Sequence, residues 1–154
     1  MSNCAYGYVL TSHVERVSQL LEAAAQRANI GLEFIADREL FNFPDASLPR
    51  TPHVTFLLGD RPGKNTVTYL ADLIDYAPDA SIGLPLRGED RLAILIDWLV
   101  EVAKEPDVVL LAIAICESNE IEEQVQVPVG RARARMQDDF IQYAPPNKLY
   151  IITK

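Results

Sequence analysis

The longest apolar run of the chain, VVLLAIAIC at Val108 to Cys116, restricts the fold more than any other feature of the sequence. A membrane-spanning helix needs about twice this length, and the β-branched residues of the run favour an extended conformation. We therefore expect a buried strand that lies centrally in a β-sheet.

Helical spacing of apolar residues indicates the elements that pack on such a sheet. The clearest stripe runs from Val14 to Ala28, after a Ser12–Glu15 stretch that fits a capping box and before Gly31, which we expect to stop the helix. Three more helices are predicted over 67–77, 92–103 and 131–143; the last of these places Ala132, Met136 and Phe140 on one side.

Five shorter segments have the composition of strands: 6–10, 32–36, 53–58, 125–129 and 149–153. Pro128 cannot donate to a ladder, so 125–129 is predicted to lie at a sheet edge. Residues 38–52 contain three prolines among apolar side chains, which predicts a packed excursion without regular structure. Strands and helices alternate along the chain, so we predict one α/β domain over residues 1–154, with a mixed sheet of about five or six strands and helices packed on it.

Composition narrows the function classes. The chain has 14 basic and 22 acidic residues, a net charge of −8, and 49% hydrophobic residues, values that disfavour disorder, nucleic-acid binding and a membrane partner. Cys4 and Cys116 lie too far apart for a redox pair or a metal-spaced cluster. With no secretory signal pattern at the N-terminus, we expect reduced thiols and a cytoplasmic protein.

No complete catalytic motif is present, and we expect no enzyme activity, metal or cofactor. His13 and His53 lack ligand-like or catalytic spacing, so a structural role is expected for each. The segment Gly59 to Thr66 (GDRPGKNT) departs from a phosphate-binding loop, because three residues instead of four separate its glycines and Asn65 replaces the hydroxyl. A strand-to-helix turn is the favoured interpretation; the alternative is an anion site at Arg61, Gly63 and Lys64.

The densest charge cluster is Glu117 to Glu123 (ESNEIEE), with four acids and no base. Such a block is either a solvated loop or a surface that attracts a basic partner. Phe41 and Phe43 in the 38–52 segment would suit a binding hot spot if exposed, with burial beneath the sheet edge as the alternative.

In size, charge, interleaved α/β layout and the acidic segment Glu117 to Glu123, the chain resembles the small acidic immunity proteins of bacterial toxin systems. This resemblance implies that it neutralises a cognate toxin, or another basic protein, by covering its active site or an essential surface. The expected partner-binding residues are Glu117, Glu120, Glu122, Glu123, Phe41 and Phe43. Two alternatives stay open: a binder or enzyme for small anionic ligands, and an adaptor or self-associating subunit such as a homodimer.

Overall fold

The apolar run becomes β4 (Leu110–Glu117), one of the two central strands of the sheet in the computed structural model. The structure describes residues 3–60, 83–85, 87–117, 119–141 and 145–154. Within these residues it contains a six-stranded sheet of order β2-β3-β1-β4-β6-β5. The other strands are β1 (Asn3–Leu10), β2 (Gly31–Phe34), β3 (His53–Gly59), β5 (Glu123–Pro128) and β6 (Lys148–Thr153).

Neighbouring strands pair antiparallel except β5 and β6, which pair parallel at the outer margin. The sheet is therefore mixed, and the predicted fold class is confirmed. The prediction that 125–129 forms an edge strand is also confirmed, because β5 ends the strand order and closes at Pro128.

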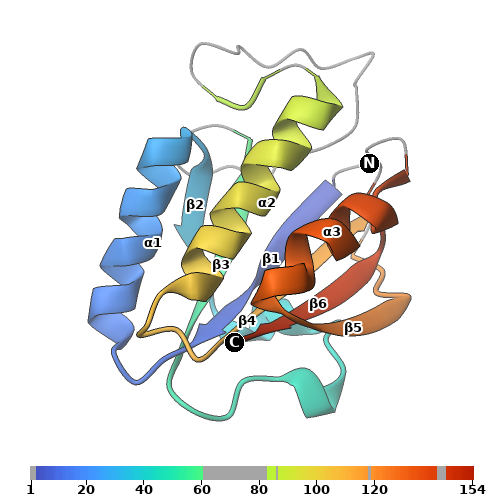
Figure 1. Cartoon of the computed structure of the whole chain (residues 1–154). Helices are drawn as coiled ribbons and strands as arrows, with labels where there is room; N and C mark the ends of the chain where they lie inside the picture. The colour runs from blue at the N-terminus through green and yellow to red at the C-terminus, as the bar shows by residue number, and fades with distance from the viewer. Residues whose placement is uncertain (1–2, 61–82, 86, 118, 142–144) are drawn as a thin grey trace.

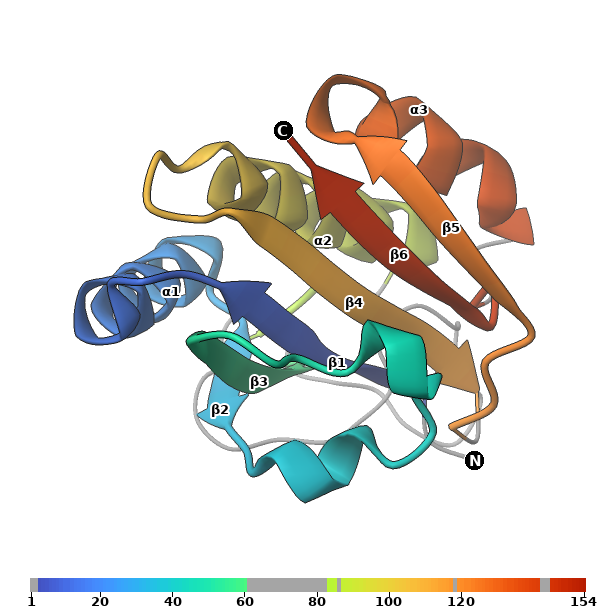
Figure 2. The same ribbon diagram turned by 90° about the horizontal axis from the view of Figure 1, so that it is seen from below.

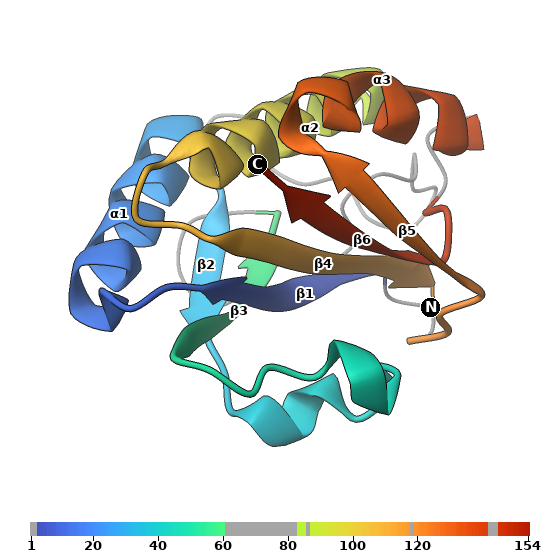
Figure 3. The same cartoon turned by 60° about the horizontal axis from the view of Figure 1, so that its bottom comes forward.

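Three α-helices of the described residues pack on one face of the sheet (Figures 1 and 3): α1 (Val14–Ala28), α2 (Gly88–Lys104) and α3 (Val129–Asp139). They enclose the larger hydrophobic core between themselves and the sheet. The Trp98 ring of α2 lies 5.6 Å from the Phe56 ring of β3, centroid to centroid, and both side chains are buried. The predicted helix over 67–77 lies outside the described residues.

The opposite face is covered in part by the segment 35–52, which Figure 3 shows on the far side of the sheet from the helices. It contains two 3-10 turns, Asp37–Leu40 and Asp45–Ser47, and places Leu40 and Phe43 in a second hydrophobic cluster with Tyr6 and Tyr8. This is the packed excursion that the sequence predicts. The segment is anchored at β1, where the Tyr8 hydroxyl donates a hydrogen bond to the Ser47 carbonyl at 2.5 Å.

The ends of α1 differ from the expectation. The predicted capping box at Ser12 is wrong, because His13 occupies the N-cap position. The hydroxyl that accepts a backbone N–H here belongs to Thr11, one residue before Ser12, and its partner is the His13 N–H at 2.9 Å. Asn29 in the left-handed conformation (φ 57°) ends the helix, which leaves Gly31 to begin β2. Val14 is 41% exposed and lies outside the buried stripe.

Among the described residues, no helix combines the length and the apolar composition that crossing a membrane requires.

Candidate functional site

The acidic segment forms the connection between β4, which ends at Glu117, and β5, which begins at Glu123. Asn147, just before β6, holds it from both sides. Its side-chain Oδ1 accepts the N–H of Glu117 and its carbonyl accepts the N–H of Glu122, each at 2.7 Å. Asn147 itself has a left-handed backbone (φ 57°), a conformation that asparagine adopts more readily than most residues. The turn that carries the acids is therefore fixed by the neighbouring strand.

The four glutamates of this segment do not share one environment. Glu123 is tied into its own fold, because it forms ion pairs with Lys148 at 3.2 Å and with Arg135 at 3.8 Å. Glu117 is half-buried at the end of β4. Only Glu120 and Glu122 combine exposure with the absence of an ion pair to any described residue. The predicted four-carboxylate surface is thus reduced to these two.

Glu123 belongs to a network that joins α3 to the sheet margin. The Asp139 carboxylate accepts hydrogen bonds from Arg135 at 2.9 Å, Tyr150 at 2.8 Å and Lys148 at 3.1 Å. Burial alone would raise the pKa of Asp139, but the three donors outweigh it and hold that pKa below its ordinary value. Burial, reinforced by the bond to Asp139, raises the pKa of Tyr150 far above its ordinary range. Arg135 and Asp139 are four positions apart on α3, so they lie on the same face of this helix.

The two phenylalanines have opposite placements. Phe43 is 4% exposed and its ring lies 5.7 Å and 6.2 Å from the rings of Tyr6 and Tyr8, so it is a core residue that cannot contact a partner in this fold. Phe41, two positions earlier, is 71% exposed. The alternation follows from the first 3-10 turn, which directs Leu40 and Phe43 toward the sheet.

A side-chain hydrogen bond brings Phe41 next to the acidic turn. Asn42 Nδ2 donates to the Asn119 carbonyl at 2.6 Å, and these residues are the chain neighbours of Phe41 and Glu120. We call Phe41, Glu120 and Glu122 the acidic-aromatic patch. The sequence predicted all three members of the patch but not Asn42, Asn119 and Asn147, which hold them together. Asn119 and Asn147 have positive φ angles, and an asparagine near the end of a strand is the sequence feature that could have predicted these turns.

The alternative anion site falls outside what can be described, because Arg61, Gly63 and Lys64 all lie outside the described residues. The residue before them, Asp60, is fully buried, and its carbonyl accepts the N–H of Leu84 at 2.7 Å.

Each histidine has a carboxylate neighbour of its own. His53 Nε2 lies 2.8 Å from Asp37 Oδ2, and its Nδ1 lies 2.7 Å from the Thr51 carbonyl, so both ring nitrogens contact the fold. The Thr55 hydroxyl also bonds Asp37, at 2.6 Å. This bond, opposed by burial and helped by His53, lowers the pKa of Asp37. The group fastens the 35–52 segment to β3.

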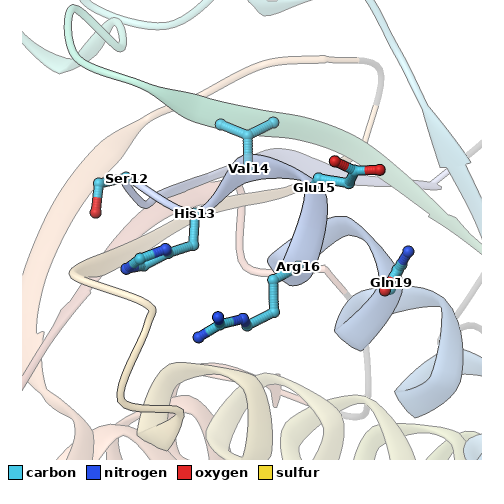
Figure 4. Close-up of a pocket in the computed structure, with 6 residues that line it drawn as sticks. All are labelled: Ser12, His13, Val14, Glu15, Arg16 and Gln19. Carbon is cyan, nitrogen blue, oxygen red and sulfur yellow. The ribbon is translucent and has the colours of Figure 1, made fainter.

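The other histidine lies in a surface hollow of about 500 Å³ at the start of α1 (Figure 4). His13 and Arg16 extend to the same side there, and both face Asp107, at 3.8 Å and 3.0 Å. Because Asp107 already pairs with Arg16 and lies near His13, we assign no ligand to this hollow.

The positions of the two cysteines meet in the sheet. Positions 4 and 116 lie directly opposite each other in the β1–β4 ladder, although 112 positions separate them in the sequence. The Cys116 side chain is fully buried. Among the described residues, no three His, Cys, Asp or Glu side chains are grouped so that they could hold a metal ion.

Comparison with known proteins adds no relative: no protein-family model, curated protein or solved structure matches the chain.

Proposed function

We propose that this protein works by binding a basic protein through the acidic-aromatic patch, in the manner of an immunity protein that neutralises a cognate toxin. The observation that supports this most directly is the hydrogen bond from Asn42 to Asn119, which places an exposed aromatic residue beside two exposed carboxylates.

The two kinds of side chain would act at different stages of binding. Glu120 and Glu122 attract a positively charged surface over a distance and so raise the association rate. Phe41 then loses its contact with water on docking, and this burial slows dissociation. The charge of −8 on the whole chain favours the same class of partner.

A toxin whose active site holds nucleic acid or another anionic substrate would present a cleft lined with cations. Carboxylates placed over that cleft would compete with the substrate for the same cations, so the protein would act as a competitive inhibitor. We expect such a complex to form in the cytoplasm.

The proposal is tested with the product of the open reading frame next to the gene for this chain. Co-expression should relieve growth inhibition by that product, and the two proteins should co-purify as a defined complex. Glu120→Lys with Glu122→Lys should abolish the rescue, and Phe41→Ala should weaken the complex by roughly tenfold or more, the loss expected at a hot spot.

The matched control reverses the same amount of charge on the helical face. Glu22 on α1 and Asp138 on α3 are exposed and form no ion pair with any described residue, so Glu22→Lys with Asp138→Lys should retain rescue. If both double variants rescue equally well, the patch is not the binding surface.

A further inference from the structure

A second surface feature lies on the same side of the sheet as the 35–52 segment. It is a groove of about 350 Å³ between residues 46–51 and the sheet, reaching the edge strand β5. Figure 2 looks onto this face, with the 35–52 segment in front of the sheet and β5 at the margin.

A hydrogen bond from Ser47 connects the 35–52 segment to β5 beside the groove. Ser47 Oγ donates to Gln124 Oε1 at 2.6 Å, and the Ser47 carbonyl accepts from Tyr8, so this wall is fixed. The chain then passes through Pro49 and Pro52 and returns to β3 at His53. Leu10 and Leu110 in the floor stay only half-buried, and Gln126 on β5 stays exposed.

The lining has the chemistry of a small-molecule site. Its floor is apolar, with Leu10, Leu110 and Ile151, while Gln124 and Gln126 place carboxamides along one rim. Ligand sites typically combine an apolar surface with a few polar groups in a volume of about 300–1,000 Å³. The groove is at the lower end of that range, which limits the occupant to a small molecule.

Arg50 is the one charged residue among the described lining residues, and it is exposed. It forms no ion pair with any described residue, and its hydrogen bond to the Asp45 carbonyl is long, at 3.5 Å. By contrast, Arg16, Arg133 and Arg135 each pair with a carboxylate. In a chain with excess acid, an arginine without such a partner above an apolar floor is suited to a carboxylate from outside, which its planar fork can bind through two hydrogen bonds.

We propose that this groove binds a small monocarboxylate with an apolar body. The carboxylate contacts Arg50, with the Gln124 and Gln126 amides as further donors, and the apolar body lies on Leu10, Leu110 and Ile151. The residues of this site differ from those of the acidic-aromatic patch, and the proposal does not depend on the proposed partner.

The test is an NMR titration of the ¹⁵N-labelled protein with octanoate, and with 1-octanol as the neutral analogue. Octanoate should give saturable shift changes at the backbone amides of 46–48, 50 and 51, of Gln124 and Gln126 and of Ile151, and should bind more tightly than octanol. Arg50→Gln should weaken octanoate by roughly tenfold or more, because it removes a charge-assisted pair, and should leave octanol unchanged.

Two variants separate the groove from general charge effects. Arg131→Gln on α3 removes an exposed arginine that also forms no ion pair with a described residue, and it should leave octanoate affinity unchanged. Gln126→Trp should block the groove and weaken both probes while Arg50 stays in place. Shift changes centred elsewhere, an absence of saturation at millimolar octanoate, or equal affinity in wild type and Arg50→Gln would each overturn the proposal.

Discussion

At the scale of single residues, Gly7 is the position where the backbone leaves least room. A Cβ at this site of β1 would lie 1.8 Å from the Ala112 carbonyl oxygen and 2.9 Å from the Ile113 Cα, both backbone atoms of β4. Gly7→Ala must therefore move β1 away from β4. We expect a loss of about 1–3 kcal/mol in the free energy of unfolding, measured by urea denaturation.

Gly130 provides the matched control for that substitution. A Cβ there would meet no atom within 4 Å, and the residue lies in the first turn of α3. Gly130→Ala should leave stability unchanged or raise it by up to about 1 kcal/mol. Equal effects of the two alanine substitutions would show that the β1–β4 approach is not as close as described.

Residue type and hydrophobicity indicated Phe41, Glu120 and Glu122 as candidates, but they could not separate Phe41 from Phe43. The difference depends on a single 3-10 turn. The segment around it contains three prolines, and its apolar residues show no regular spacing from which the turn could be predicted. Glu123 could not be set apart either, because Lys148 and Arg135 come from β6 and α3. Their proximity exists only once β5 and β6 have paired.

At the scale of elements, Asn147 controls the turn that carries the acids. Asn147→Gly keeps the left-handed backbone and loses only the bond to the Glu117 N–H. Asn147→Ala loses that bond and adds backbone strain, because alanine lacks the polar side chain whose local hydrogen bonds help asparagine to adopt the left-handed conformation. Hydrogen exchange at Glu117 should accelerate in both variants, whereas exchange at Glu122 should accelerate mainly in Asn147→Ala. Identical exchange in the two variants would contradict this role.

The network around Asp139 should make the attachment of α3 dependent on pH. Because its pKa is lower in the folded chain than in the unfolded chain, the stabilisation by this group is complete above about pH 4, the unfolded value, and is lost as pH falls through the folded value. At pH 7, Asp139→Asn should lower the free energy of unfolding by about 1–3 kcal/mol, since it weakens bonds from charged donors. The difference from wild type should shrink near pH 3.

The neighbouring residue is the control for this pH dependence. Asp138 is exposed and forms no ion pair with a described residue, so Asp138→Asn should change stability little at either pH. Denaturation curves at pH 7 and pH 3 for both variants provide the measurement. A loss in Asp139→Asn that stays constant over this range would argue against a role for its charge.

Most elements follow from local pattern, because each buries one face and carries that periodicity in its own sequence. The strand at 108–116, the helix at 92–103 and the edge strand before α3 are all present in the structure. The ends of the elements were harder to predict from the sequence. The helix predicted over 131–143 is α3, which begins at Val129, directly after Pro128, and ends at Asp139, because Phe140 leaves the helical conformation. Both ends of α1 were predicted one or two residues away from where they lie, because several neighbouring side chains can cap a helix. Thr11 and Ser12 both have a hydroxyl at the N-terminal end, and Asn29 can end the helix in place of Gly31.

At the scale of the whole molecule, the fold class was predictable but the strand order was not. The strand-helix-strand sequence β5-α3-β6 favours a parallel pair, as observed. Nothing local indicates that β1 lies between β3 and β4. Its residues are 43 to 53 positions from their partners in β3 and 100 to 114 positions from those in β4, and the arrangement depends on how the faces of all six strands are buried together.

The charge of the whole chain leads to a last prediction, on the rate of binding. Each Glu→Lys or Asp→Lys reversal adds two positive charges, so the patch variant and the helical-face variant both change the net charge from −8 to −4. If attraction depended on net charge alone, both variants would associate with a basic partner equally slowly. Charges close to the docking surface dominate once the partners approach within the Debye length, about 8 Å at physiological salt. Stopped-flow association at low salt should therefore slow by about tenfold more for Glu120→Lys with Glu122→Lys than for Glu22→Lys with Asp138→Lys, and the gap should narrow as salt is added. Equal slowing of both variants would mean that the whole molecule attracts its partner and that the acidic-aromatic patch does not direct the approach.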